Sequence, residues 1–271
     1  MVTLFENNRI NSETRSSKGN QLKWRDDTTW YKADYTGYEG LSEYMISQLL
    51  RFSSLQDEEF VVYEPENIRY RASLFHGVKS KDFLPDGFQL ITLERLFQNA
   101  YGRSLNTMIY KTENKENRLK LLVSETERVT GLKGFGSYMA KILAIDTFFL
   151  NEDRHTHNIA VLANGLGEYR LCPIFDQGAG LLADTTIDYP LTGDIYEMMA
   201  SVHSKTFCDD FAEQLDIADR LYGRHIRFTF TKKDIDFLLA KVPEDIYDSS
   251  LKERVRTILY EQMRQYPNLF A

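Results

Sequence analysis

Two aspartates and an asparagine at fixed spacing constrain this chain more than any other feature. Asp153 and Asn158 lie five positions apart in a polar stretch, and Asp176 follows at the end of a short apolar run, directly before a glycine-containing turn. Phosphoryl transfer requires a protein to place a hydroxyl near one carboxylate while an asparagine and a second carboxylate hold the magnesium ions of the nucleotide. The spacing therefore suits Asp153 as a base and the other two residues as metal ligands.

Each of these residues taken alone also fits an ordinary turn. Asp153 falls in a polar loop between an apolar helix expected over residues 138–150 and a strand expected near residues 159–162, and loops held in this way often carry function. Asp176 alone is most often a turn residue. A magnesium ion, however, needs only one or two protein carboxylates, with phosphates and waters as its other ligands. The two motifs together favour the metal-binding interpretation.

The composition indicates a globular protein with room for two lobes. The chain has 271 residues, of which 42% are hydrophobic and 13% aromatic, enough for a substantial core. A polar interval over residues 76–87 ends in a Pro-Asp-Gly turn signal and marks the best boundary. We expect an α+β, bilobal fold, with a mixed β-sheet small lobe over residues 1–84 and a mainly helical large lobe over residues 85–271.

Charge and composition disfavour several classes of partner and site. The formal net charge of -7 opposes non-specific attraction to nucleic acid, so no direct nucleic-acid partner is expected. The amino terminus lacks a basic segment followed by an apolar one, and the chain has no run of about eighteen apolar residues, which predicts a cytoplasmic protein without a membrane segment. Cys172 and Cys208, the only cysteines, form no CxxC pair, so neither a disulfide framework nor a cysteine zinc site is expected.

The expected secondary structure changes along the chain from strands to helices. In the first lobe, two strands joined by an Asp26-Asp27 turn precede a helix over residues 39–53. A hairpin follows, with strands at residues 59–64 and 68–75 and a turn at residues 65–67. Thr92 is a candidate helix cap. Further helices are expected at residues 119–129, 138–150, 205–222, 231–241 and 250–265, with strands near residues 159–162 and 169–171.

Lys32 lies in an apolar strand context, which is unusual for a fully solvated amine. It could reach nucleotide phosphates and pair with an acid on the next helix, either Glu43 or Glu39. The alternative is a lysine that extends from an edge strand into water. Residues 16–23 precede this strand, where a loop covering the phosphates is expected, although a single glycine makes no Walker motif. The glycines of residues 131–136 instead suit a connection between two helices.

The histidines near Asp153 permit a second chemistry. Asp153, His155 and His157 form an Asp-x-His-x-His pattern, and carboxylate and imidazole are both common zinc ligands, so a metal-dependent hydrolase is an alternative. A further ligand would have to come from elsewhere in the chain, and the other histidines have no companion pattern. In the kinase interpretation, His155 is expected to hydrogen-bond within the loop and to hold Asp153.

The motifs together resemble the HipA-like serine/threonine kinases, a bacterial family that includes toxins of toxin–antitoxin pairs and whose fold is related to that of the eukaryotic protein kinases. The matching positions run in family order over nearly the whole chain, and they are Ser16, Gly19, Gln21, Lys23, Lys32, Ser42, Glu43, Tyr44, Asp153, His155, Asn158, and the run from Pro173 to Asp176. This resemblance implies the bilobal kinase fold.

The resemblance also implies roles for the matching residues. The expected site consists of Asp153 and His155 in catalysis, Asn158 and Asp176 on Mg²⁺, and Ser16, Gly19, Gln21, Lys23, Lys32 and Glu43 around the phosphates of ATP. Members of the family also phosphorylate themselves on a serine at the position of Ser16, which expels that loop and switches the enzyme off. Ser17 is the second choice for this phosphosite.

The chain departs from the family pattern at two places. Position 157 is His where many members carry Lys, and the chain begins almost at the phosphate loop, whereas long members have an extra amino-terminal domain that meets a DNA-binding antitoxin. We therefore expect a compact, Mg²⁺- and ATP-dependent kinase that acts on Ser or Thr of a protein substrate, with an antitoxin or regulatory protein as a further partner. A nucleotide-binding pseudokinase and the hydrolase are the alternatives.

Overall fold

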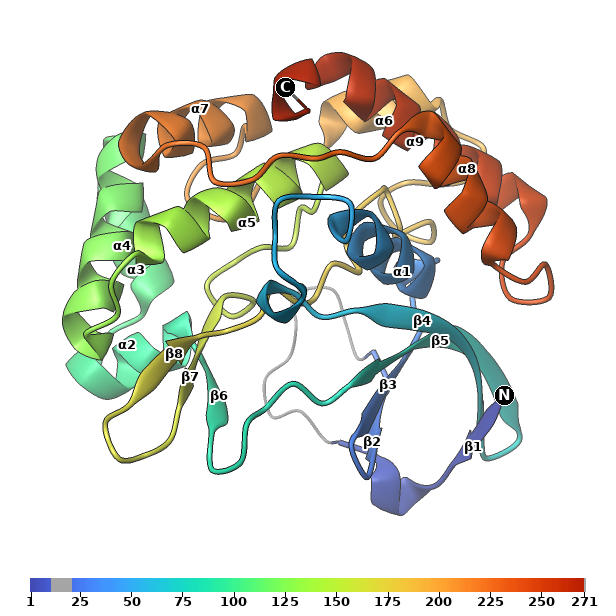
Figure 1. Ribbon diagram of the computed structural model, residues 1–271, viewed down its shortest axis with the longest axis horizontal. Helices are drawn as coiled ribbons and strands as arrows, with labels where there is room; N and C mark the ends of the chain where they lie inside the picture. The colour runs from blue at the N-terminus through green and yellow to red at the C-terminus, as the bar shows by residue number, and fades with distance from the viewer. Residues whose placement is uncertain (11–20, 271) are drawn as a thin grey trace. The chain divides into compact units, whose positions relative to one another are not determined.

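The computed structural model describes residues 1–10 and 21–270, and these form two compact units (Figure 1). Among the described residues, unit 1 contains 1–10, 21–82, 175–202 and 227–270, and unit 2 contains 83–174 and 203–226. The first change of unit follows Asp82. The rest of the chain does not divide into the two consecutive lobes that were predicted. Residues 175–202 and the carboxy-terminal helices belong to the same unit as the amino-terminal sheet and its helix.

The sheet of unit 1 has five strands in the order β1-β4-β5-β3-β2. The strands are β1 (Val2–Leu4), β2 (Lys23–Asp26), β3 (Thr29–Ala33), β4 (Tyr63–Tyr70) and β5 (Ser73–Lys81), all antiparallel to their neighbours except β1, which is parallel to β4. β2 and β3 confirm the strand pair predicted around Asp26. Trp24, Ile68 and Tyr70 are buried together on this sheet, and this burial sets the register because a shift by one residue would turn them to the other face.

The second hairpin corrects the prediction. Its turn lies at Arg71, which adopts a φ of 55°, and β4 runs straight through Pro65, where the sequence indicated a turn. The Tyr63 N–H points away from β5 and donates to Ser47 Oγ (3.0 Å). Pro65 comes two positions later on the strand, so its nitrogen also points away from β5. The missing N–H of the proline therefore removes no bond to β5. Burial of Ile68 in the core then extends the strand beyond Pro65.

Helix α1 (Glu39–Leu50) is the centre of unit 1. It is buried along most of its length, on nearly all sides, and contacts β4, β5 and α8. The unit also contains α6 (Ile195–Ser201), α8 (Lys232–Lys241), α9 (Ser249–Gln265) and the short 3₁₀ helices Glu6–Asn8, Asp57–Glu59 and Pro267–Leu269. The helices predicted for α1, α8 and α9 are confirmed. Helix α6 was not predicted, although Asp194 provides its cap by accepting from two backbone N–H groups.

Unit 2 is built around the apolar helix α5, which packs against α4 and α7. Its helices are α2 (Leu93–Tyr101), α3 (Leu105–Lys111), α4 (Lys115–Thr130), α5 (Phe135–Phe149) and α7 (Phe211–Tyr222), and its antiparallel sheet has the order β6 (Gln89–Thr92), β7 (Ala160–Ala163), β8 (Tyr169–Leu171). Thr92 caps α2 as predicted, by accepting from Arg95 N–H. Gly131 and Gly134 adopt left-handed conformations between α4 and α5, which confirms the predicted connection.

Helix α7 begins later than the sequence suggested. The expected start near residue 205 is wrong because Asp210 caps the helix by accepting from Glu213 N–H, and residues 204–209 form a loop before it. The mixture of sheet and helix in the chain confirms the α+β class. In the part of the chain that the structure describes, no helix is both long and apolar enough to cross a membrane.

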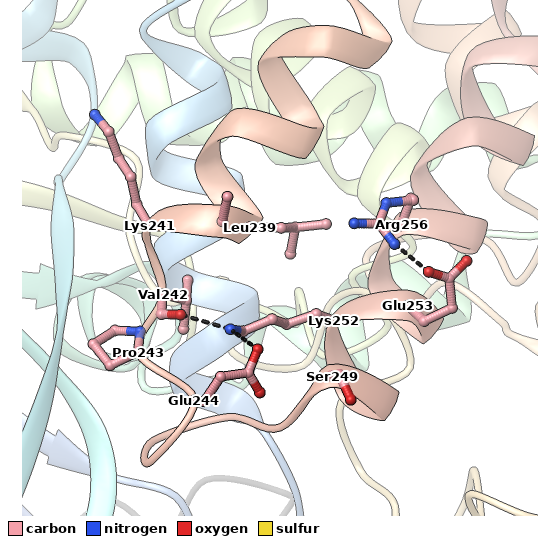
Figure 2. Close-up of a pocket in the computed structure, with 10 residues that line it drawn as sticks. Leu239, Lys241, Val242, Pro243, Glu244, Ser249, Lys252, Glu253 and Arg256 are labelled. Atoms are coloured by element: carbon pink, nitrogen blue, oxygen red, sulfur yellow. Dashed lines mark hydrogen bonds and ion pairs between the residues drawn. The ribbon is translucent and has the colours of Figure 1, made fainter.

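A cavity of about 560 Å³ lies where α8 ends and α9 begins (Figure 2). Lys252 enters it from the first turn of α9 and donates to Val242 O (2.6 Å) and to Glu244 Oε1 (2.8 Å), as the dashed lines in Figure 2 show. Lys241 and Arg256 also line this cavity. Its lining contains none of the described residues that the sequence assigned to the functional site.

Asp34 joins the end of β3 to two other parts of unit 1. Its Oδ1 accepts the backbone N–H of Gly40 in α1 (2.6 Å), and its Oδ2 accepts the hydroxyl of Tyr247 (2.7 Å). Burial, followed by the nearby charge of Glu39, raises the pKa of Asp34 to about 8. The carboxyl is therefore protonated in the folded protein over a pH range in which the unfolded chain is ionised.

This difference predicts how stability depends on pH. A carboxyl whose pKa is raised by folding binds a proton as the chain folds, so its contribution is complete below the ordinary value of 3.8 and is lost as the pH rises towards about 8. Asp34→Asn keeps an acceptor for Gly40 and a polar partner for Tyr247 but does not titrate. Urea denaturation should show that the free energy of unfolding falls less between pH 5 and pH 8 in Asp34→Asn than in the wild type.

Asp216→Asn, a change of an exposed residue of α7, is the control and should keep the wild-type pH dependence. Equal pH dependence in Asp34→Asn and the wild type would show that Asp34 does not carry this effect.

Candidate active site

Unit 1 brings Lys32, Glu43 and Asp176 into one ionic cluster. The Nζ of Lys32 lies 2.5 Å from Glu43 Oε1 and 2.9 Å from Asp176 Oδ1. Lys32 comes from β3 and Glu43 from α1, while Asp176 lies 144 positions after the lysine. Of the two acids that the sequence offered to Lys32, the structure therefore selects Glu43. Glu39 instead accepts backbone N–H groups of residues 35–37, in the turn that leads into α1.

Contacts between α1 and the chain after Asp176 hold this cluster together. Ser42 donates its hydroxyl to the carbonyl oxygens of Gln177 (2.9 Å) and Gly180 (3.0 Å). At Gly178, an added Cβ would come within 3.3 Å of the Glu39 side chain and 3.7 Å of Glu43, so a glycine permits the close approach to the helix. The segment is thus fixed against the helix face that carries Glu43.

The backbone at Asp176 is itself unusual. Asp176 adopts a φ of 63°, in the left-handed region that residues other than glycine seldom occupy. Aspartate tolerates this region better than most residues, but such conformations persist mainly where the surroundings impose them and gather at functional sites. Here the conformation accompanies a carboxylate that faces Lys32.

The cluster is a polar site in an apolar setting. Burial opposes the charge of Lys32, but Asp176 and Glu43 together raise its pKa well above the ordinary value, so Lys32 stays protonated. The ring of Tyr63 lies 5.0 Å from the same ammonium group. Glu43 Oε2 is buried and has no hydrogen-bond partner among the described residues. The Asp176 carboxylate on the edge of this cluster is partly exposed, and a carboxylate is the kind of ligand that magnesium takes from a protein.

A second lysine lies next to this cluster. Lys23 of β2 is directly opposite Lys32 of β3, so the two side chains project from the same face of the sheet. Like charges at opposed positions repel each other, and the Glu43 carboxylate interacts electrostatically with both lysines. Gln21 precedes β2 and is half-buried. Ser16 and Gly19, which were also expected near the phosphates, lie outside the described residues.

Unit 2 holds the other predicted residues in the loop between α5 and β7. The side-chain amide of Asn158 donates to Asp153 O (2.8 Å) and to Asp153 Oδ2 (3.3 Å), so the two residues predicted five positions apart are in direct contact. Asp153 is buried, with 6% of its surface exposed. The loop therefore presents a carboxylate whose position is set by its own backbone and by the asparagine.

The sequence analysis missed the residue that braces this loop, Arg154. Its guanidinium is 1% exposed and forms a two-point ion pair with Asp146 of α5, from Nε to Oδ2 (2.9 Å) and from NH2 to Oδ1 (3.2 Å). It also donates to the carbonyl oxygen of Asn158 (2.9 Å), and Asn151 adds a bond to Asp146 Oδ1 (2.8 Å). The available signal was Asp146, a charged residue in the mainly apolar stretch 142–149 of α5.

His155 lies beside Asp153 in this loop. The Nδ1 of His155 accepts the backbone N–H of His157 (3.2 Å), so the proton of the neutral ring is on Nε2, which lies 3.6 Å from Asp153 Oδ1. His155 thus hydrogen-bonds within the loop, and its ring lies beside the Asp153 carboxylate. His157 is exposed, and its ring meets that of His155 edge to face, with 5.5 Å between centroids.

The hydrolase alternative lacks a ligand set in the described part of the chain. Residues 1–10 and 21–270 contain no group of three or more His, Cys, Asp and Glu side chains arranged to hold a metal ion. A catalytic zinc needs three such ligands, whereas magnesium on a nucleotide takes one or two from the protein. The donor set thus fits the second type of metal site better than the first.

Comparison with solved structures identifies the fold. A crystal structure of the Helicobacter pylori proinflammatory kinase CtkA matches with a TM-score of 0.62 and 18% identity, over 99% of this chain and 96% of that chain. The protein has a HipA-like kinase fold. A Shewanella oneidensis HipA, solved with HipB and operator DNA, has a TM-score of 0.47 and 12% identity, over 96% of this chain and 66% of that one. No protein-family model and no curated protein matches the sequence.

The HipA-like fold confirms the resemblance drawn from the motifs at the level of architecture. At 18% identity the likeness to CtkA defines the fold alone. The roles of individual residues therefore depend on the chemistry of the two clusters, Lys32-Glu43-Asp176 in unit 1 and Asp153-Asn158 in unit 2.

The bracing role of Arg154 predicts a large loss of stability on its removal. Replacing one partner of a buried ion pair leaves the other charge without compensation, which typically costs about 3–5 kcal/mol. Arg154→Met should lower the free energy of unfolding by about that amount in urea denaturation. Asp146→Asn combined with Arg154→Met should recover part of the loss, because no uncompensated charge remains.

The control is Arg170→Met, which removes an exposed arginine paired with Glu168 on the surface. Such pairs contribute about 0–1 kcal/mol, so the stability should hardly change. Equal effects of Arg154→Met and Arg170→Met would contradict the bracing role.

Proposed function

We propose that this protein is a Mg²⁺- and ATP-dependent serine/threonine protein kinase of HipA-like type. The observation that carries the proposal is the Lys32 ammonium held between Glu43 and Asp176 in a chain with a kinase fold. A protonated lysine fixed by a helix carboxylate is suited to polyphosphate, and an adjacent carboxylate is suited to the metal that accompanies it. The intact set of polar residues favours a catalyst over a nucleotide-binding pseudokinase.

Each residue of the two clusters has one task in this proposal. Lys32 binds the phosphates of ATP, and Lys23, on the same face of the sheet, adds positive charge beside it. Asp176 and Asn158 are each proposed as ligands that would hold Mg²⁺, and the metal would neutralise the charge that develops on the phosphate oxygens. Ser16, Gly19 and Gln21 belong to the loop that is proposed to cover the phosphates.

Asp153 is proposed to accept the proton of the acceptor hydroxyl. As the Ser or Thr oxygen bonds to the γ-phosphorus, the bond from that phosphorus to the oxygen that bridges it to the β-phosphate breaks, and ADP leaves with the bond's electron pair. The hydroxyl proton passes to the Asp153 carboxylate. Asn158 holds Asp153 in place, and the Nε2–H of His155 supports the carboxylate electrostatically at 3.6 Å.

The proposed acceptors are proteins, including this chain itself. By the family resemblance, Ser16 is the site of autophosphorylation, with Ser17 as the second choice, and an antitoxin or regulatory protein is a further partner. The reaction would take place in the cytoplasm.

The role of Asp153 can be tested by phosphate transfer. General-base catalysis typically contributes about 10²–10⁴-fold, so Asp153→Ala should lower the rate of transfer to protein substrates by at least about a hundredfold while leaving ATP affinity nearly unchanged. Mass spectrometry after incubation with Mg²⁺ and ATP should show phosphate within residues 16–18 of the wild type and much less in Asp153→Ala.

Asp216→Ala, which removes an exposed aspartate of α7, is the matched control and should behave as the wild type. If Asp153→Ala phosphorylates residues 16–18 as fast as the wild type does, Asp153 is not the base.

The role of Asp176 can be tested by binding. Asp176→Ala removes a proposed metal ligand, so calorimetry should show that Mg²⁺ no longer strengthens ATP binding, whereas Mg²⁺ strengthens it in the wild type. Asp26→Ala, which changes an exposed carboxylate of β2, is the control. An unchanged Mg²⁺ effect in Asp176→Ala would refute the assignment of Asp176 as a metal ligand.

A further inference from the structure

Residues 186–197 of unit 1 expose apolar side chains at unusually high density. Ile187, Leu191 and Tyr196 are 70%, 54% and 58% exposed, and Pro190 lies exposed among them. Single exposed apolar residues are ordinary on protein surfaces, but several in one short segment indicate an interaction surface. We call residues 186–197 the docking segment.

A buried arginine holds the inner side of the docking segment in place. Arg254 of α9 is 5% exposed and donates to the carbonyl oxygen of Tyr189 (3.0 Å) and to the hydroxyl of Tyr38 (3.0 Å). Its guanidinium also lies 3.7 Å from the sulfur of Met198, which directly follows the segment. Tyr189 and Met198 are buried, so the segment has a fixed inner face and an exposed outer face.

Local hydrogen bonds fix the backbone that carries the exposed side chains. Tyr189 N–H donates to Asp184 O (2.8 Å), and Ile187 N–H donates to Asp184 Oδ1 (3.0 Å). Gly193 N–H closes a turn onto Pro190 O (3.1 Å), with Leu191 inside the turn, and the cap of Asp194 starts α6 directly afterwards. A surface ordered before binding costs less entropy to use, which favours binding by these residues.

The docking segment is also acidic. From Asp176 to Ser204 the chain contains no lysine or arginine, and Asp188, Asp194 and Glu197 of the segment are exposed. Arg264 of α9, which interacts electrostatically with Tyr196, is itself paired with Glu261 at 2.5 Å. The surface thus offers apolar side chains surrounded by negative charge.

We propose that the docking segment binds the acceptor protein through a basic, apolar stretch, in which Lys or Arg residues flank an aliphatic or aromatic residue. The proposal rests on the proposed kinase function and specifies its substrate class. The apolar side chains supply the anchors and the carboxylates select positive charge. A second copy of this chain is disfavoured as the occupant, because a two-fold interface would place the same acidic surface against itself.

Peptide binding tests the proposal without requiring phosphate transfer. The probes are two fluorescent serine peptides that share a leucine, one with flanking arginines and one with glutamates in their place. In anisotropy titrations the wild type should bind the arginine peptide at least about tenfold more tightly than the glutamate peptide. Leu191→Ser should weaken binding of the arginine peptide about fivefold or more, and Glu197→Gln should reduce its salt dependence.

Leu74→Ser is the matched control, because Leu74 of β5 belongs to the same unit and is also 54% exposed. It should bind the arginine peptide as the wild type does. The docking surface is overturned if both peptides bind equally, if Leu191→Ser and Leu74→Ser behave alike, or if ultracentrifugation shows a dimer that Leu191→Ser abolishes.

Phosphate transfer to the arginine peptide separates this proposal from the kinase function. Transfer by the wild type with no loss in Leu191→Ser would overturn the docking surface and leave the kinase function intact. Selective binding of the arginine peptide without transfer would overturn the kinase function and still support the binding surface.

Discussion

The ammonium group of Lys32 contacts two carboxylates at once. The arrangement of unit 1 around it depends on keeping both carboxylates within reach of the lysine. Lys32 comes from a strand, Glu43 from the central helix and Asp176 from a segment much later in the chain. A charge in this apolar setting is tolerated only with its partners in place, because an uncompensated buried charge costs several kcal/mol. The hydroxyl of Ser42, the small size of Gly178 and the left-handed backbone of Asp176 all serve to keep these three elements in contact.

A buried cation that joins separate segments also occurs at two other places in the structure. Arg154 in unit 2 joins α5 to the loop that carries Asp153 and Asn158, and Arg254 in unit 1 joins α9 to the inner face of the docking segment. In each case one buried arginine joins a helix to a segment that has little regular structure of its own. A guanidinium suits this task because its donors are held in a rigid fork. These loops are thereby held in place without forming helices or strands.

The sequence analysis was correct where a helix, strand or cap follows from residues that are close together in the chain. Helices α1, α8 and α9 and the cap at Thr92 were predictable because their apolar period and capping residues are local properties of the chain. The turn assigned to Pro65 was wrong because burial of Ile68 and the direction of the Pro65 nitrogen, neither of which is local, decided the course of β4. The importance of Arg154 was missed because an arginine in a polar loop gives no sign that its partner is an aspartate of the preceding helix.

The sequence by itself determined which residue types are available for the chemistry: the aspartates and the asparagine at their spacing, and a lysine in an apolar strand followed by a helix with a glutamate. It also indicated the HipA-like fold, because the order of these motifs along the chain is a property of the sequence. Only the tertiary structure decided that Lys32 pairs with Glu43 rather than Glu39, that Asp176 completes the cluster, and that an apolar, acidic segment is fixed on the surface by Arg254. These contacts join residues 65 or 144 positions apart or select between near neighbours on one helix, and packing and burial, rather than spacing, determine both.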